Sequence, residues 1–337
     1  MSMNRTWFVC AAAVAAAVMP LLSSAQSSSA DLDALVKAAK AEGEVVLYSA
    51  PTENVARRVS DAFTAKYGIK VSFLRLASQV LQQRHAAEAE SGSPATDLFI
   101  NSGGLALIYA EESIKKGWLD PISTQNLPAM RDFPKRWVTG PTAIVQIAPW
   151  ALMYNTNKMK QGQLKDWTVL LDPKLKGQVL LSDPRVSSAY LEFWTALLSK
   201  YGEDFFVKLR PNLRQVATGV QAAQGVGAGE GIFLIPAVVG QIQQIKEKGA
   251  PINWVMFDYT TAVQQHLLLT ARGKSKHPAA GRLLANYLMS PEGNKVLNDE
   301  PGGFTVYETD KAPKQLQSPQ IAMVLAKQRD IVRLLGF

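Results

Sequence analysis

One stretch decides the fold: Leu181-Ser182-Asp183-Pro184-Arg185-Val186-Ser187-Ser188-Ala189-Tyr190. The apolar run Val179-Leu180-Leu181 at its start predicts a short buried strand. After the proline turn, apolar residues recur at the spacing of one helix face; they are Tyr190, Leu191, Trp194, Leu197, Leu198 and Tyr201. The pattern therefore predicts a strand that enters a helix through a serine turn.

This turn has two interpretations. A helix that begins at a serine turn presents free backbone N–H groups and hydroxyls at its N-terminus, and such termini bind anions. Alternatively, Ser187 or Ser188 only caps its own helix, as serine commonly does at this position. The local pattern alone leaves both open.

The first residues have the pattern of a secretory signal peptide. Arg5 is the positive start, Trp7 to Leu22 is mostly apolar, and Ser23-Ser24-Ala25 fits the small-residue cleavage rule. We therefore expect residues 1–25 to be removed and the mature protein to be periplasmic. A retained anchor is the alternative, but the apolar run is short for a bilayer. Cys10, the single cysteine, would leave with this segment, so neither a disulfide nor a cysteine nucleophile is expected.

The charge balance argues against a nucleic-acid partner. The 337 residues carry a formal net charge of +8, but Lys and Arg are scattered along the chain. A nucleic-acid footprint requires clustered basic residues. A mildly basic exported protein is better suited to attract a small anion.

Strands and helices alternate along the chain. Strands are predicted at 45–48, 69–74, 97–100, 143–147, 151–154, 179–181, 231–235, 252–256 and 266–270. Helices are predicted at 31–42, after a Ser/Gln linker over 26–29, and at 53–67, 78–90, 105–116, 188–201, from 203, 219–228, 239–248, 278–289, 291–297 and from 321. The alternation indicates an α/β fold with parallel sheets covered by helices on both faces, and the length suggests two lobes.

Three loops follow predicted strands and offer hydroxyls and helix starts: Ser49 to Glu53, Asn101 to Gly104, and Asp183 to Ala189. Ligands of open parallel sheets bind beyond the carboxyl ends of the strands. Taken singly, each loop is explained by capping; taken together, they favour a binding cleft. Arg75, just past a strand, offers either a bidentate anion contact or a surface ion pair.

Other motifs give no catalytic or metal site. His85, His266 and His277 are far apart in the sequence, and His85 lies on a predicted polar helix face, where exposure is expected. No Gly-x-Ser-x-Gly elbow surrounds a serine. We therefore predict no cofactor and no metal. Four aromatic residues are candidates for a cavity wall, with core packing as the alternative for the last: Trp150, Tyr154, Tyr190 and Trp194.

Several motifs in a fixed order resemble a known family. They are Gly43-Glu44-Val45-Val46-Leu47-Tyr48-Ser49-Ala50, Phe63-Thr64-Ala65-Lys66-Tyr67-Gly68-Ile69-Lys70-Val71, Ser93-Pro94-Ala95-Thr96-Asp97-Leu98, Tyr154-Asn155-Thr156-Asn157, the serine turn at 183–190, and Met289-Ser290-Pro291-Glu292-Gly293. Together they resemble the periplasmic solute-binding proteins of ABC importers. The branch is the one that contains ferric-iron-binding proteins and their phosphosugar- and phosphonate-binding relatives.

The resemblance implies a type II periplasmic-binding-protein fold, in which two lobes joined by two crossing strands close on a ligand. We expect lobe 1 to comprise residues 27–143 plus 264–306, and lobe 2 residues 144–263 plus 307–337. An inner-membrane permease and an ATPase are the implied partners of this non-enzymatic protein, which we expect to be a monomer.

The sequence departs from the iron-binding pattern. Iron binders supply a histidine in the first loop, an acidic residue after the third strand and a tyrosine pair after a strand of the second lobe. The corresponding stretches here are Pro51-Thr52-Glu53, Asn101-Ser102-Gly103 and Ile235-Pro236-Ala237. A small organic anion, phosphorylated, phosphonate or carboxylate, is therefore expected, with the serine turn as its best-supported anchor. Ferric iron or an iron chelate is the alternative; a secreted hydrolase or a sensor-docking protein is the alternative of another class.

The predicted ligand-binding residues come from the loops, from the strand end near 235 and from the turn near 258. They are Ser49, Thr52, Arg75, Ser102, Gly103, Arg185, Ser187, Ser188, Ala189, Ile235, Pro236, Asp258 and Tyr259.

Overall fold

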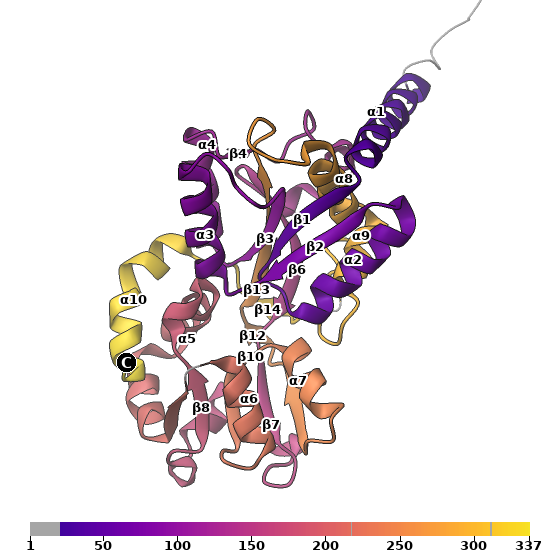
Figure 1. Cartoon of the computed structure of the whole chain (residues 1–337). Coiled ribbons are helices and arrows are strands. Elements are labelled where there is room, and N and C mark those ends of the chain that lie inside the picture. Colours follow the sequence, from indigo (N-terminus) through magenta and orange to yellow (C-terminus); the bar gives the residue numbers. More distant parts are fainter. Residues whose placement is uncertain (1–20, 217, 311) are drawn as a thin grey trace, which may run out of the picture.

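The computed structural model describes residues 21–216, 218–310 and 312–337 and has two α/β lobes, one above the other in Figure 1. Each lobe is built around one β-sheet. We call the elements around the larger sheet lobe 1 and those around the smaller sheet lobe 2.

Lobe 1 has a seven-stranded sheet in the order β2-β1-β3-β13-β6-β5, with β4 paired to β13. Its strands are β1 (Glu44–Ser49), β2 (Lys70–Arg75), β3 (Leu98–Ser102), β4 (Leu119–Asp120), β5 (Val138–Thr139), β6 (Thr142–Pro149) and β13 (Ala262–Thr270). Its helices are α1 (Leu21–Glu42), α2 (Glu53–Tyr67), α3 (Ser78–Glu90), α4 (Leu105–Lys115), α8 (Pro278–Met289) and α9 (Pro291–Asn298).

Helices cover both faces of this sheet, because apolar side chains of its strands point alternately to one face and the other. Val45 and Leu47 of β1 pack into a core with α1, α2, α8 and α9. Tyr48, the next residue of β1, points to the other face and packs with Leu81 of α3 and Ala106 of α4. Successive side chains of a strand point to opposite faces, so one short apolar strand supplies both cores.

Lobe 2 has a five-stranded sheet in the order β11-β7-β10-β8-β9. Its strands are β7 (Ala151–Asn155), β8 (Val179–Ser182), β9 (Leu213–Val216), β10 (Phe233–Ala237) and β11 (Ile252–Val255). Its helices are α5 (Ser188–Leu209), α6 (Gly219–Gly227), α7 (Val239–Lys246) and α10 (Ile321–Leu335). Helices α5 and α10 cover one face, and α6 and α7 cover the other.

The remaining helical segments are short 3-10 turns in the connections. They are η1 (Pro128–Arg131), η2 (Lys135–Trp137), η3 (Gln161–Gln163), η4 (Trp167–Leu171), η5 (Pro173–Leu175), η6 (Pro184–Val186) and η7 (Arg210–Asn212).

The expectation of purely parallel sheets is wrong. Strand β1 is parallel to β2 and β3, and β8 is parallel to β9 and β10. However, β13 runs antiparallel to β3 and β6, and β7 runs antiparallel to β10 and β11. The chain enters β13 from lobe 2 and β7 from lobe 1. Each of these two strands therefore runs antiparallel to the neighbouring strands of its own sheet.

Two crossings lie side by side at the waist. Strand β6 passes into β7 through Trp150, and β11 returns to β13 through β12 (Tyr259–Thr260). Trp150 N donates to Thr261 O at 3.0 Å, and Thr260 Oγ1 donates to Trp150 O at 3.1 Å. The predicted lobe boundaries at 143 and 264 therefore fall inside β6 and β13.

A third crossing follows α9. It contains β14 (Gln315–Leu316), which pairs in parallel with β12 before the chain enters α10 of lobe 2. The chain thus crosses three times among the described residues, where the resemblance implied two crossing strands.

Two helix predictions need comment. Helix α1 includes residues 21–30, where a Ser/Gln linker over 26–29 was predicted before a helix at 31–42, because the sequence has no Gly or Pro between Pro20 and Gly43 to stop the helix. It projects from lobe 1 in Figure 1. Residues 1–20 of the predicted signal peptide lie outside the described residues, and residues 21–25 lie in α1. The two helices predicted from Ser188 and Glu203 are confirmed as the two segments of α5, which are separated by a non-helical residue, Gly202, with φ 72° and ψ −178°.

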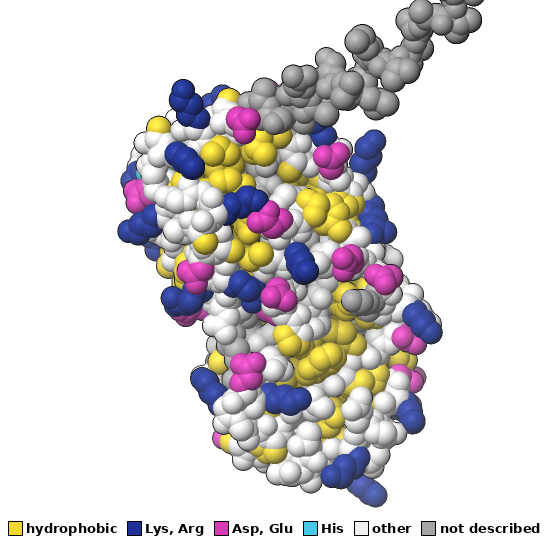
Figure 2. Space-filling model, turned by 90° about the vertical axis from the view of Figure 1, so that its right-hand side faces the viewer, with side chains coloured by type: hydrophobic (Ala, Val, Ile, Leu, Met, Phe, Trp, Pro, Cys, Tyr) yellow, Lys and Arg dark blue, Asp and Glu magenta, His cyan; other side chains and the backbone are white. Residues whose placement is uncertain are grey.

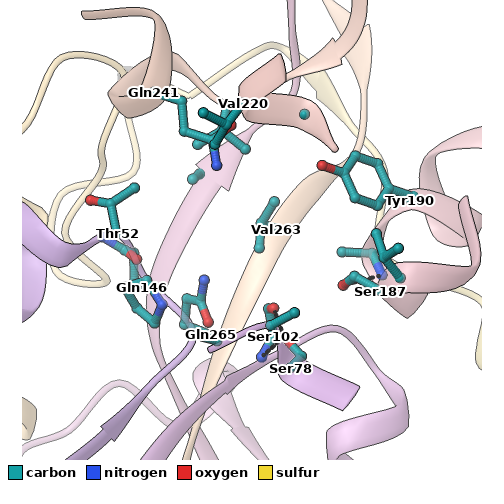
Figure 3. A pocket seen from close by; sticks show the side chains of 18 of the residues that line it. Thr52, Ser78, Ser102, Gln146, Ser187, Tyr190, Val220, Gln241, Val263 and Gln265 are labelled. Carbon is teal, nitrogen blue, oxygen red and sulfur yellow. Dashed lines mark hydrogen bonds between the residues drawn. The ribbon is translucent and has the colours of Figure 1, made fainter. Parts of the chain in front are cut away.

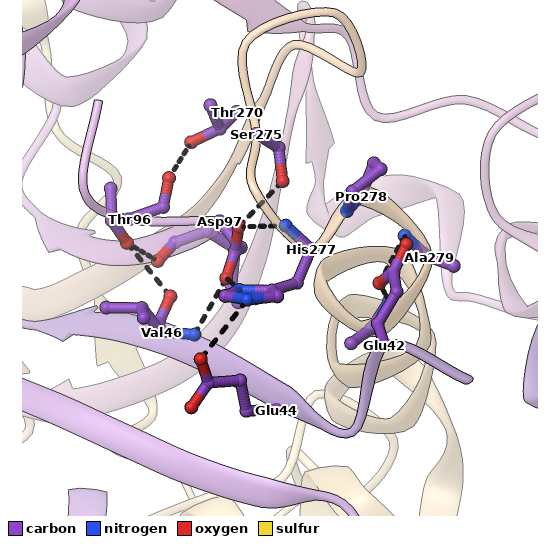
Figure 4. Close-up of polar contacts among 12 residues, drawn as sticks. Glu42, Glu44, Val46, Thr96, Asp97, Thr270, Ser275, His277, Pro278 and Ala279 are labelled. Atoms are coloured by element: carbon purple, nitrogen blue, oxygen red, sulfur yellow. Dashed lines mark hydrogen bonds and ion pairs between the residues drawn. The ribbon is translucent and has the colours of Figure 1, made fainter. Parts of the chain in front are cut away.

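A buried carboxylate ties strand β1 to the start of α8 (Figure 4). Asp97 accepts hydrogen bonds from Val46 N at 2.8 Å, from Ser275 Oγ at 2.7 Å and from His277 Nδ1 at 2.9 Å. His277 Nε2 lies 3.3 Å from Glu44 Oε1. These donors satisfy the hydrogen-bonding capacity of the buried Asp97 carboxylate. The His277–Asp97 pair therefore links segments of lobe 1 and has a structural role.

The expectation that His85 is exposed is wrong. His85 is buried, its Nδ1 lies 2.7 Å from Tyr109 Oη, and its ring packs on Phe99. Burial lowers the pKa of His85 to about 4, so the ring is neutral at neutral pH.

Candidate ligand-binding site

A cavity of about 240 Å³ lies between the lobes, close to the waist. Its walls come from the loops after β1, β2 and β8, from the crossing strands β6 and β13, and from the starts of α6 and α7. Figure 3 shows side chains that surround an open centre near Val263. A concave cavity between two lobes, with apolar walls and a few polar groups, is a candidate ligand site.

Five helices begin at this cavity. The N-caps or first residues that line it are Thr52 of α2, Ala77 and Ser78 of α3, Ser187 of α5, Thr218 of α6 and Val238 of α7. Each start carries unpaired backbone N–H groups and the positive end of a helix dipole. The arrangement therefore creates a positive potential inside the cavity.

The helices differ in whether a side chain caps the backbone N–H groups of their first turn. Ser187 Oγ accepts from Ala189 N at 3.3 Å, and Thr218 Oγ1 accepts from Gln221 N at 3.2 Å, so α5 and α6 are capped. Helices α2, α3 and α7 have no side-chain cap. The least satisfied N–H groups at the cavity therefore include those of α2 and α3, both in lobe 1.

Arg75 supplies a positive side chain beside these helices. It ends β2, it is exposed, and its Nε donates to Pro51 O at 3.3 Å in the loop before α2. Its charge also acts on Tyr190: burial raises the pKa of that phenol, while a hydrogen bond with Ser182 and the Arg75 charge oppose the rise. Among the lining residues that the structure describes, Arg75 is the only Lys or Arg.

Glu300 is the only carboxylate among those lining residues. Burial raises the pKa of Glu300 above its ordinary value, and the charge of Arg58 lowers it by a smaller amount. Gln146 Nε2 lies 3.5 Å from Glu300 Oε1. The cavity therefore has a positive side at Arg75 and an acceptor side at Glu300.

Apolar groups complete the walls. The rings of Trp150 and Tyr190 stack with their centroids 5.0 Å apart and their planes 26° from parallel. Val186 and Val220, both partly exposed, lie at the cavity with Val263. Of the four aromatic candidates, Trp150 and Tyr190 line the cavity, while Tyr154 and Trp194 are buried in the core of lobe 2.

The structure brings together five of the residues predicted from the sequence. Thr52, Arg75, Ser102, Ser187 and Ala189 line the cavity. Ser102 Oγ is hydrogen-bonded to Ser78 Oγ, which begins α3. Ser49 is buried beneath this surface, with its Oγ 3.5 Å from Pro51 O.

Other predicted residues lie away from the cavity for identifiable reasons. Arg185 is held by Asp183, with Nη2 to Oδ2 at 2.5 Å, because the Pro184 turn brings the two side chains together. Ile235 and Pro236 are buried in β10. Asp258 is exposed at the waist, and Tyr259 Oη donates to Ala196 O at 3.0 Å on another side of α5.

Gly103 and Ser188 meet where the lobes touch. Gly103 has φ 87°, and a Cβ there would collide with Ser188 Oγ of lobe 2. Next to this contact, Gly104 N donates to Glu192 Oε1 at 2.6 Å, so a side chain of α5 caps α4 in the other lobe. Burial raises the pKa of Glu192 to about 7, against hydrogen bonds from Gly104 and Ser188 that lower it.

Several lining residues were not predicted from the sequence. Gln146 and Gln265 are polar residues within the apolar runs of β6 and β13, and that interruption is a usable signal. Thr218 and Gln241 belong to helix starts after strands of lobe 2, and the same loop rule applies to them. Glu300 lies in an irregular segment, where the sequence offers no pattern.

Within residues 21–337, apart from the two gaps, no group of three or more His, Cys, Asp or Glu side chains is placed to hold a metal ion. Among the helices described, none is long and apolar enough to span a bilayer. Lys and Arg are scattered among acidic residues on the face shown in Figure 2.

Comparisons with known proteins agree with this architecture. A protein of Haemophilus influenzae, described only as uncharacterized, is 24% identical over 270 residues, which is 77% of this chain and 76% of the relative. The solved structure of the periplasmic binding protein AfuA from Actinobacillus pleuropneumoniae, with fructose-6-phosphate bound, is similar with a TM-score of 0.67 and 20% identity. It covers 87% of this chain and 97% of that chain.

Iron-bound HitA from Pseudomonas aeruginosa is similar with a TM-score of 0.69 and 19% identity, over 87% of this chain and 99% of that chain. At these identities the likeness concerns the fold, and it confirms the predicted two-lobe, type II periplasmic-binding-protein fold. The family model for bacterial extracellular solute-binding proteins matches residues 93–332. The chain belongs to the family of bacterial extracellular solute-binding proteins.

Proposed function

We propose that this protein is the periplasmic substrate-binding component of an ABC importer, and that it captures a small organic anion between its lobes. The observation that carries this proposal is the convergence of five helix N-termini and Arg75 on the interlobe cavity. Helix N-termini and guanidinium groups are the standard partners of phosphate, phosphonate and carboxylate groups.

The anionic group would lie on the side of lobe 1. Helices α2 and α3 have no side-chain caps, and Arg75 ends the strand that leads to α3. An anion there would accept hydrogen bonds from backbone N–H groups and from the guanidinium at once. The serine turn of lobe 2, which the sequence pattern favoured as the anchor, would then be a further contact of the anion and not its main one.

The serine turn would contribute from lobe 2. Ser187 Oγ already accepts from Ala189 N, which leaves its O–H free to donate into the cavity. Ligand contacts from both lobes favour the closed arrangement, because only that arrangement satisfies them together. Stacked Trp150 and Tyr190 offer an apolar surface for the organic part.

Ferric iron remains the second candidate, because iron-bound HitA is among the structures with the same fold. Hard ferric iron requires several anionic oxygen ligands. Among the described lining residues the protein offers Tyr190 and Glu300 for that role. An organic anion therefore fits the cavity better than a bare ferric ion, and a ferric chelate would have to bring its own ligands.

The rest of the proposal follows from the family. A permease and an ATPase in the inner membrane would receive the solute, the N-terminal segment would direct export, and the protein would act as a monomer without catalysis. The proposed lobe boundaries for this movement are residues 27–143 plus 264–306 for lobe 1 and 144–263 plus 307–337 for lobe 2.

A thermal-shift screen tests the proposal. The panel contains sugar phosphates, alkylphosphonates, mono- and dicarboxylates, and ferric citrate. A ligand at about 100 times its dissociation constant stabilises the folded state by roughly 2.7 kcal/mol, which is a readable shift. We expect organic anions to raise the melting temperature. Stabilisation by free ferric iron alone, with none by any organic anion, would contradict the proposal.

A further inference from the structure

One part of the cavity wall presents hydrogen-bond acceptors, from Glu300 and Gln146. Glu300 follows α9 of lobe 1 and reaches the first turn of α7 in lobe 2, where a Cβ on Gly240 would lie 2.7 Å from Glu300 Oε2. An ionised carboxylate accepts hydrogen bonds and donates none. A carboxylate at a helix N-terminus is stabilised by the positive end of the dipole.

Arg58 fixes the segment that carries Glu300. Its Nε donates to Val296 O at 2.7 Å and its Nη2 to Leu297 O at 3.1 Å, at the end of α9. The Arg58 charge favours the ionised form of Glu300 from the lobe 1 side. The carboxylate is therefore held in place by its own lobe before any ligand enters.

The amide of Gln146 is oriented by its neighbours. Gln146 is buried in β6, and its Nε2 donates to Leu297 O at 3.2 Å and lies 3.5 Å from Glu300 Oε1. Both neighbours are acceptors, so the amide nitrogen must face them and the amide oxygen is left for the cavity. Glu300 and Gln146 thus present acceptors side by side, and we call this pair the acceptor pair.

We infer that the ligand carries hydrogen-bond donors, hydroxyl or ammonium, on the part of the molecule that meets the acceptor pair Glu300 and Gln146. This inference rests on the proposed function, since it assumes that the anionic group lies near Arg75. An anionic group at the acceptor pair would face a carboxylate, and an alkyl group there would leave a buried carboxylate without a partner. In Figure 3, Gln146 and Gln265 lie across the cavity from Tyr190 and Ser187.

Only some small anions could bind both Arg75 and the acceptor pair. Inorganic phosphate, simple alkyl acids and aromatic acids could pair with Arg75 but would offer no donor to the acceptor pair. Hydroxylated or amino-bearing phosphate esters, phosphonates and carboxylates could do both. Glu300 is then a specificity-determining residue, because it selects among anions that Arg75 accepts equally.

Matched probe pairs test this inference by calorimetric titration of the whole chain. The pairs are glycerol 3-phosphate against propyl phosphate, 2-aminoethylphosphonate against propylphosphonate, and gluconate against hexanoate. In each class that binds, we expect the donor-bearing probe to bind at least about tenfold more tightly, the usual effect of a hydrogen bond to a charged group.

Glu300→Gln should remove most of that preference, because the donor-bearing probes lose a charged acceptor and the alkyl probes no longer leave a carboxylate without a partner. Glu308→Gln, which removes an exposed carboxylate outside the cavity, is the matched control and should preserve the preference. Equal affinities within every class that binds would overturn the inference while leaving the proposed function intact. If no probe of any class bound, the proposed function itself would fail, and the inference with it.

Discussion

At the scale of single residues, neighbouring side chains with the same chemistry have different roles. Ser187 and Ser188 are adjacent, but Ser187 lines the cavity whereas Ser188 meets Gly103 of the other lobe and hydrogen-bonds Glu192. The difference arises because Ser187 is the extended N-cap of α5 and Ser188 is its first helical residue. Sequence spacing cannot separate the two, since both fit a capping or anion-binding pattern.

We predict that Ser187→Ala weakens ligand binding and that Ser188→Ala does not. Loss of the Ser187 hydroxyl removes a donor to the anion, worth roughly tenfold in affinity. It also removes the α5 cap, at a cost of about 1 kcal/mol of stability. Calorimetry with the best ligand of the thermal-shift screen and urea unfolding measure the two effects. A larger loss of affinity in Ser188→Ala than in Ser187→Ala would contradict this assignment.

At the scale of elements, the contact between α5 and α4 joins the lobes. Glu192 of α5 accepts from Gly104 N, the N-cap position of α4, and it is 2% exposed. When the lobes separate, this carboxyl returns to water and its pKa returns to about 4.3. Where α5 contacts α4, burial raises the pKa of Glu192 to about 7. Forming this contact therefore binds a proton between roughly pH 4.3 and 7.

Closure and ligand affinity should therefore strengthen as pH falls through this window and weaken as pH rises toward 7. His85 and His266, whose pKa values burial lowers to about 4, stay neutral over most of the window. We predict that Glu192→Gln removes this part of the pH dependence, because an amide oxygen still accepts from Gly104 N without titrating. The measurement is the ratio of wild-type to variant affinity for one probe between pH 5 and 8.

The exposed α5 residue Glu203, changed to Gln, is the control and should behave as the wild type. An affinity ratio between wild type and Glu192→Gln that stays constant from pH 5 to 8 would show that the carboxyl does not titrate on closure.

Most elements were predictable from the sequence, and their arrangement was less so. The apolar strands β1 and β3 and the helices α8 and α9 match their predicted ranges to within about two residues, because Gly and Pro mark their ends. The antiparallel strands were missed because they depend on contacts between distant segments, whereas the predicted bound between residues 306 and 307 already required the chain to cross a third time. His85 was misjudged because its partner Tyr109 lies on another helix.

Some residues of the candidate binding site were predicted from the sequence and others were not. Thr52, Arg75, Ser102 and Ser187 follow strands and were found by the rule that ligands bind at the carboxyl ends of parallel strands. Gln146, Gln265 and Glu300 come from crossing strands and an irregular segment. Their positions depend on how the two lobes meet, and no local pattern encodes that.

In the whole molecule, both lobes would have to contact the proposed ligand. Lobe 1 brings Arg75, the starts of α2 and α3, and Glu300, while lobe 2 brings Ser187 and the stacked Tyr190. Each lobe alone would supply only some of the hydrogen bonds and apolar contacts that the ligand needs. Ligand binding and lobe closure are therefore expected to be one coupled equilibrium.

Calorimetric titration of wild-type and Arg75→Gln protein tests whether the interlobe cavity is the anion site. The control is Arg185→Gln, which removes an exposed guanidinium that pairs with Asp183 outside the cavity. We predict that wild type and the control bind the best organic anion of the screen with one site, and that Arg75→Gln binds it about 10- to 100-fold more weakly. Equal affinity in wild type and Arg75→Gln would contradict the claim that this cavity is the anion site.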